Sequence, residues 1–112
     1  MLSAQEMGME AMEENAGRAC GLLKSMANET RLMILCHLCG GERTVGELLE
    51  TVPLSQSALS QHLAVLRREE LVTTTRHAQS ISYSLASGEV RAIIDTLHML
   101  YCADDTKASV TA

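Results

Sequence analysis

Two helix patterns follow each other almost without a linker in the segment TVGELLETVPLSQSALSQHLAVLRREE. Thr44 is a favourable N-cap for the first helix, and Pro53 ends it because proline cannot continue a helix. Ser55 is a favourable N-cap for the second helix, which spans residues 56–70. Two helices joined by so tight a turn are typical of a helix-turn-helix motif, whose second helix reads the major groove of DNA.

The rest of the 112-residue chain adds three helices and a hairpin. Apolar residues recur every three or four positions before and after the motif, which predicts amphipathic helices, two of them beginning after the N-caps Asn28 and Ser87. The β-rich runs LVTTTR and ISYSLA flank the turn HAQS and predict the hairpin. The predicted fold is therefore mainly α with a small β-hairpin, in the order helix-helix-helix-helix-strand-strand-helix. The predicted elements span residues 9–26, 29–39, 45–52, 56–70, 71–76, 81–86 and 88–102.

The second helix of the motif carries polar side chains on the side opposite to its leucines. Glutamine can bond adenine through two hydrogen bonds, serine can reach bases or phosphates, and the helix N-terminus attracts phosphate. Simple exposure to water would also explain each of these side chains, but a helix-turn-helix followed by a hairpin with arginine at its tip favours DNA. We therefore predict DNA contacts from Ser55, Gln56, Ser57, Ser60, Gln61, His62 and Arg67 on the helix and from Arg76, His77 and Gln79 on the hairpin.

Composition and charge limit the remaining choices. The net charge of −5 argues against a nucleic-acid partner, but the acidic residues gather near the two ends, which leaves room for a locally basic face. No run of eighteen apolar residues could span a membrane, and the acidic amino terminus is unlike a signal peptide. We expect a cytoplasmic protein with reduced thiols and without a cofactor. No set of nucleophile, base and acid is evident outside the cysteines, so we do not expect an enzyme.

Three segments together resemble the ArsR/SmtB family of winged-helix repressors over residues 16–103: LLKSMANETRLMILCHL, VGELLETVPLSQSALSQHLAVLRREELV and ISYSLA. The resemblance implies a winged helix-turn-helix domain, here over residues 9–103, between flexible ends at residues 1–8 and 104–112. It also implies a homodimer joined through the first and last helices that binds an inverted-repeat operator on double-stranded DNA. Both of these helices have more apolar surface than so small a core can use, which agrees with a dimer.

Cys36 and Cys39 lie in an otherwise apolar helix, where core packing, metal binding and redox chemistry are the three explanations to separate. Their spacing places them on one helix face, where Cys102 could join them as a third metal ligand. Structural zinc prefers four converging ligands, and a fourth is hard to find. Cys20 fits the apolar side of the first helix, whereas Cys39 fits burial, a competing disulfide with Cys36 or a modulating role.

Two metal sites known in the resembled family are not complete in this chain. The Cys-x-Cys of its arsenic and cadmium sites lies on the third helix, where this chain reads TVGELL without a cysteine. Another family site uses Asp and His ligands on the last helix, and Asp95 and His98 supply only part of such a set. We therefore predict no metal site, although Cys39 keeps a thiolate metal site open as an alternative.

The placement of ILC in the second helix and LYC at the end of the last one resembles the persulfide-sensing branch of the family. The resemblance implies that Cys36 and Cys102 are the sensing dithiol and that reactive sulfur species are the inducer. Packed helices lie about 8–10 Å apart, whereas a disulfide needs Cα atoms within about 7 Å. Each inserted sulfur lengthens the bridge by about 2 Å, so a polysulfide could join helices that a plain disulfide would strain.

The sequence thus predicts a transcriptional regulator whose operator affinity changes when Cys36 and Cys102 are crosslinked. Two alternatives remain. One is a metal- or arsenite-responsive repressor that uses cysteine thiolates, and the other is an antirepressor that competes with a nucleoid protein.

Overall fold

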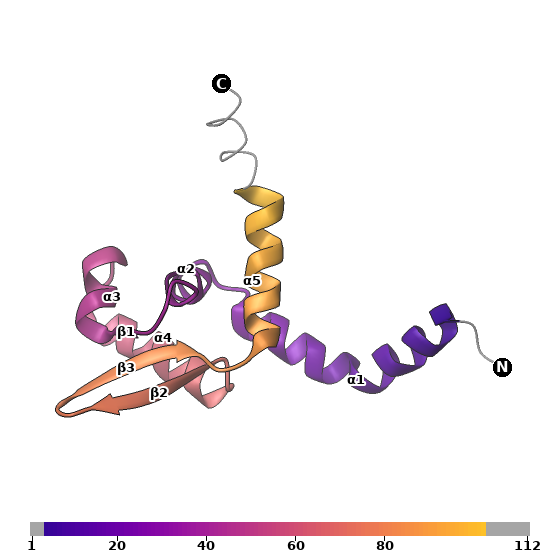
Figure 1. Ribbon diagram of the computed structural model, residues 1–112, viewed down its shortest axis with the longest axis horizontal. Coiled ribbons are helices and arrows are strands. Elements are labelled where there is room, and N and C mark those ends of the chain that lie inside the picture. Colours follow the sequence, from indigo (N-terminus) through magenta and orange to yellow (C-terminus); the bar gives the residue numbers. More distant parts are fainter. Residues whose placement is uncertain (1–3, 103–112) are drawn as a thin grey trace, which may run out of the picture.

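The computed structural model describes the backbone of residues 4–102 and the side chains of residues 8–102. Five helices and three strands follow in the order α1 (Ala4–Met26), α2 (Glu29–Leu38), β1 (Arg43–Thr44), α3 (Val45–Thr51), α4 (Gln56–Arg68), β2 (Val72–His77), β3 (Ser80–Leu85) and α5 (Gly88–Tyr101). The predicted winged helix-turn-helix architecture is confirmed (Figure 1). The predicted flexible tail at 104–112 and residues 1–3 of the predicted flexible N-terminus lie outside the described residues.

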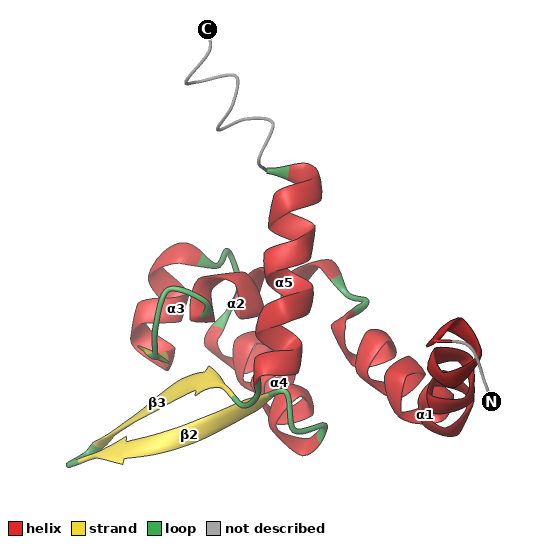
Figure 2. Ribbon diagram, turned by 45° about the vertical axis from the view of Figure 1, so that its right-hand side comes forward, coloured by secondary structure: helices red, strands yellow, loops and turns green. Residues whose placement is uncertain are grey.

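The sheet differs from the predicted two-stranded hairpin in two respects. The short strand β1 pairs with β3, so β3 becomes the centre of a three-stranded antiparallel sheet. The hairpin turn is also shorter than predicted, because the pairing of β2 with β3 continues to His77 and Ser80. Only Ala78 and Gln79 remain in the turn, where Ala78 adopts a φ of 54°. The wing is therefore a long hairpin (Figure 2), and β1 pairs with the middle of its second strand.

The helix starts were the most predictable feature, because all four expected N-caps act as caps. The side chains of Asn28, Thr44, Ser55 and Ser87 each accept a hydrogen bond from a backbone N–H group in the first turn of the following helix. Thr44 also forms a capping box, since its own N–H group donates to the Glu47 carboxylate at 2.8 Å. This bond from Thr44 lowers the pKa of Glu47.

The helix ends are less well predicted, and α4 shows why. It stops at Arg68, two residues before the predicted end, because Glu70 adopts a left-handed conformation with a φ of 64°. The N–H groups of Glu70 and Leu71 then bond back to the carbonyls of Arg67 and Leu66, at 3.0 and 2.8 Å, in a Schellman motif. Leu71 turns into the core and leads directly into β2.

One apolar core joins α2, α3, α4, the base of the wing and the first half of α5. Helix α4 contributes Leu59, Leu63 and Leu66, whose spacing of four and three residues places them on one side of the helix. The other fully buried large side chains are Ile34, Leu35, Leu38, Leu48, Leu71, Val90 and Ile94. The core therefore fixes α4 by its leucines and leaves the opposite side of the helix in solvent.

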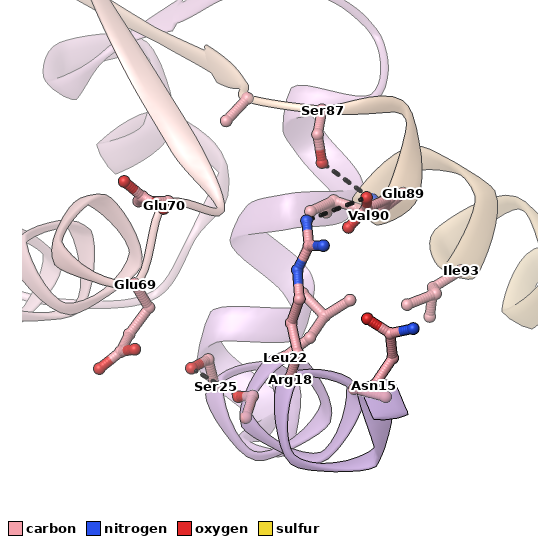
Figure 3. A pocket seen from close by; sticks show the side chains of 13 residues that line it. Asn15, Arg18, Leu22, Ser25, Glu69, Glu70, Ser87, Glu89, Val90 and Ile93 are labelled. Atoms are coloured by element: carbon pink, nitrogen blue, oxygen red, sulfur yellow. Dashed lines mark hydrogen bonds and ion pairs between the residues drawn. The ribbon is translucent and has the colours of Figure 1, made fainter. Parts of the chain in front are cut away.

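Helices α1 and α5 extend away from this core (Figure 1). Met9, Met12 and Leu23 on α1 and Met99, Leu100 and Tyr101 on α5 are exposed although they are large and apolar. A cavity of about 870 Å³ separates the second half of α1 from the end of α4 and the start of α5. Figure 3 shows the ion pair between Arg18 and Glu89 that crosses beside it, at 3.6 Å. The first helix thus contacts its own chain mainly near its C-terminal end, where Met26 is part of the core and Leu22 packs against it.

Candidate DNA-binding surface and cysteine site

The exposed side of α4 carries most of the predicted DNA-contacting residues. Gln56, Ser57, Ser60, Gln61 and Arg67 are exposed, as expected for a helix that reads a groove. Ser55 is also exposed, but its hydroxyl accepts the Ala58 N–H bond at 3.2 Å and therefore serves first as a cap. His62 differs from the others because it is half-buried on the flank of the helix.

A hollow of about 470 Å³ lies between the exposed side of α4 and β3. Its walls include the predicted contacts Ser60 and Arg67, together with three residues that the sequence pattern does not predict, Ala64, Arg68 and Tyr83. Ala64 and Arg68 continue the four-residue spacing from Ser60, so the helical period was the available signal. Tyr83 had no such signal, because its position depends on how β3 lies against α4.

The predicted DNA-contacting residues of the wing lie at its tip, but two of them already contact other groups of the same chain. Arg76, His77 and Gln79 are all exposed. The Arg76 Nε donates to the Ala78 carbonyl at 3.5 Å, and His77 Nε2 lies 2.8 Å from the Glu42 Oε1. Because Glu42 immediately precedes β1, this pair ties the wing to the chain that leaves α2.

The predicted sensor cysteines lie on α2 and at the end of α5. Cys36 and Cys39 are half-buried and pack against the core, whereas Cys102 is exposed at the C-cap of α5. Cys20 is exposed on α1, which does not support core packing for it within one protomer. None of these four cysteines forms a disulfide.

The pKa values of the two cysteines at the end of α2 depend on groups of α5 and its C-cap. Burial raises the pKa of Cys36, and the neighbouring charges of Cys39 and Cys102 raise it further. Burial also raises the pKa of Cys39, while Arg91 lowers it and Asp95 raises it. Arg91, Asp95 and Cys102 are spaced by four and seven residues and so share one face of α5. This face of α5 therefore lies toward the end of α2 that carries both thiols.

Metal ligands do not gather at this place. Among the residues that the structure describes, no three His, Cys, Asp or Glu side chains come close enough together to hold a metal ion. Asp95 and His98 thus gain no third ligand from the described part of the chain.

Comparison with known proteins identifies the family of this chain. Residues 28–74 match the family described as bacterial regulatory protein, arsR family. The transcriptional activator HlyU of Vibrio cholerae is 54% identical over 101 residues, which cover 90% of this chain and 94% of that protein. The chain belongs to the ArsR family. The biofilm growth-associated repressor of Xylella fastidiosa is 36% identical over 102 residues, which cover 91% of this ArsR-family chain and 90% of that repressor.

A solved structure extends the likeness to three dimensions. Reduced HlyU from Vibrio cholerae superposes on this ArsR-family protein with a TM-score of 0.77, at 57% identity, and covers 83% of this chain and 98% of that one. The protein is therefore a transcriptional regulator with a DNA-binding helix-turn-helix domain. Its described helices include none with the length and hydropathy needed to cross a membrane.

Proposed function

We propose that this regulator binds an inverted-repeat operator as a homodimer in the cytoplasm and that reactive sulfur species release it by bridging Cys36 to Cys102. The observation that carries the sensing step is the electrostatic effect of Cys102 on Cys36, which are 66 positions apart in the sequence but close enough in space to influence each other. The relatives include both an activator and a repressor. Release from the operator is compatible with either outcome.

The surface of α4 supports the DNA-binding part of this proposal. Gln56 and Ser57 lie at the N-terminal end, from which a recognition helix contacts base edges, and Ser60 and Gln61 follow one turn later. Arg67 and the wing residue Arg76 carry the positive charge that phosphates require. His62 is placed on the flank of the helix and fits a phosphate contact better than base reading.

The unpaired apolar surfaces of α1 and α5 support the homodimer. Such surface on a monomeric protein marks an interaction site, and a two-fold interface would bury the same patch on both protomers. Two recognition helices related by this axis would meet the two halves of a palindromic operator.

The chemistry of the sensing step can be written for an organic trisulfide, RSSSR. The thiolate of one cysteine attacks the central sulfur and releases RS⁻, which leaves a protein-bound S–S–S–R chain. The thiolate of the other cysteine attacks the same central sulfur and releases the second RS⁻. The products are a Cys36–S–S–S–Cys102 bridge and two RSH, so the trisulfide itself supplies the oxidising equivalents. Because the pKa of Cys36 is raised, its thiolate is scarce at neutral pH, and the reaction should accelerate as the pH rises.

Operator binding before and after treatment with glutathione trisulfide tests the proposal. We expect at least about a tenfold loss of affinity, as in ordinary allosteric coupling, and full recovery after reduction. Cys36→Ser and Cys102→Ser should each abolish the response, whereas Cys20→Ser should retain it. Mass spectrometry should find the two peptides joined with one sulfur more than a disulfide contains. A response that persists in both serine variants would contradict the sensing step.

The wing contact is tested by the salt dependence of binding. Arg76→Ala should weaken operator binding and lower the slope of log affinity against log salt by about one, because one phosphate contact is lost. Arg18→Ala is the matched control, since Arg18 pairs with Glu89 on the far side of the core, and its slope should not change. An unchanged slope in Arg76→Ala would remove Arg76 from the contact surface.

A further inference from the structure

The last turn of α2 is wound more tightly than the rest of the helix. The Cys39 N–H group is shared between the Leu35 carbonyl four residues earlier, at 3.1 Å, and the Cys36 carbonyl three residues earlier, at 3.2 Å, while Gly40 bonds to His37 at 3.3 Å and Gly41 to Leu38 at 3.1 Å. The helix therefore passes from α geometry into a 3₁₀ turn at Cys39. Cys36 and Cys39 therefore lie on one face of α2 at the point where the helix ends.

A shared helix face leaves only a small gap for a disulfide between the two thiols to close. Side chains three residues apart on an α-helix have Cβ atoms about 5–6 Å apart, while a disulfide needs about 3.5–4.5 Å. Closing this difference would affect only the terminal backbone bonds of α2, where the helix already tightens. Gly40 and Gly41 follow directly, and Gly41 already has a φ of 131°, so the chain beyond the pair can adjust without a side-chain clash.

The surroundings affect the pKa of both thiols. Both are half-buried, and the charge of Cys39 acts on Cys36. Arg91 lies close enough to Cys39 to stabilise its thiolate and so opposes the effect of burial. Because burial raises the pKa of both thiols, their oxidation should accelerate as the pH rises.

We propose that Cys36 and Cys39 form a redox site of their own, which a hydroperoxide converts to a disulfide within α2. In the first step, one thiol and ROOH give a sulfenic acid, Cys–SOH, and ROH. In the second step, the other thiol attacks the sulfenic sulfur, the S–S bond forms and water leaves. The bond joins residues of one helix and adds no link between α2 and α5. The site thus distinguishes peroxides from reactive sulfur species, because only the latter would join the two helices.

A consequence for sensing, which rests on the proposed function, is that the α2 disulfide removes Cys36 from the reaction with sulfane sulfur. A peroxide-treated regulator should remain on its operator and ignore a trisulfide until a reductant opens the disulfide. Cys39 then protects Cys36, because a sulfenic acid captured as a disulfide does not proceed to sulfinic acid.

Peptide mapping of the full-length protein tests the site directly. Trypsin cuts after Arg31 and Arg43, so Cys36 and Cys39 share one peptide, whereas Cys102 falls in another. After treatment with hydrogen peroxide and alkylation, we expect this peptide to lack two hydrogens and to carry no alkyl group. Cys102→Ser should give the same result, while Cys39→Ser should give Cys36 sulfinic acid. A peptide alkylated at both cysteines, or one joined chiefly to the Cys102 peptide, would overturn the proposal.

Operator binding separates this proposal from the sensing step. The peroxide-treated protein should bind the operator within about twofold of the reduced protein, since no coupling between the helices has been introduced. After peroxide treatment, dithiothreitol should restore the trisulfide response of the unchanged protein. It should not restore the response of Cys39→Ser, in which Cys36 is expected to be a sulfinic acid. If the reduced protein forms no trisulfide bridge between Cys36 and Cys102, the proposed sensing step is wrong. The peptide mapping would still show whether Cys36 and Cys39 form a disulfide. If operator binding were lost when the α2 disulfide forms, the claim that this disulfide does not couple α2 to α5 would be wrong.

Discussion

The double variant Met99→Glu/Leu100→Glu should sediment as a monomer and bind the operator about 100- to 10,000-fold more weakly than the unchanged protein, because each half-site would then be bound without the other. Met99 and Leu100 are 67% and 61% exposed, which is unusual for large apolar side chains on an amphipathic helix. Their exposure has a simple explanation if α5 packs against a second protomer.

The size of this effect follows from the two-fold symmetry of the proposed dimer. Each substitution appears twice in such an interface, and each lost apolar side chain removes about 1.5–3 kcal/mol of burial energy. The glutamates add unpaired charges of like sign. The protomer itself should stay folded, because its core contains Val90 and Ile94 from α5 but neither of the substituted residues.

Sedimentation velocity and operator binding, each over a range of protein concentrations, measure the two effects. Ile81→Glu is the control for the oligomeric state, since it places the same charge at an exposed apolar position on the wing. It should leave the protein a dimer. If the double variant remains dimeric at low concentration, the apolar ends of α5 serve another purpose and the proposed interface is wrong.

The second large effect is expected at the inner side of the recognition helix. Leu59→Ala should lower the free energy of unfolding by about 2–5 kcal/mol, because it removes a fully buried side chain and leaves a cavity. A small domain has only about 5–15 kcal/mol in total, so the midpoint of thermal unfolding should fall by at least about 10 °C.

Chemical denaturation at a fixed protein concentration measures this loss, since the stability of a dimer depends on concentration. Ile81→Ala is the matched control, because it removes a similar amount of apolar surface from an exposed strand position, and it should cost less than about 1 kcal/mol. Equal losses in the two variants would mean that α4 is not held by its leucines.

The parts of the fold that were predictable are those encoded by neighbouring residues. The four N-caps act within three positions of the side chain concerned, and the apolar spacing of α4 repeats within one turn. The predicted DNA contacts on α4 follow from the same local pattern, since the side opposite to buried leucines must be exposed.

The parts that were not predictable depend on residues distant in the sequence. Strand β1 has only two residues, too few for an alternating pattern, and exists because Arg43 and Thr44 pair with Tyr83 and Ser82. The end of α4 depends on Glu70 adopting a conformation that the sequence does not favour, since glutamate carries the steric cost that glycine avoids. The relation between Cys36 and Cys102 likewise requires the packing of two helices, which no local pattern specifies.

Strand β1 also has a mechanical consequence for the whole regulator. Four residues separate the end of α2 from β1, and the contact between Glu42 Oε1 and His77 Nε2 joins this short connection to the wing. A rotation of the end of α2 would therefore turn the wing directly, without first displacing the recognition helix. The path from the thiol-bearing end of α2 to the wing is thus shorter than the path through α3 and α4.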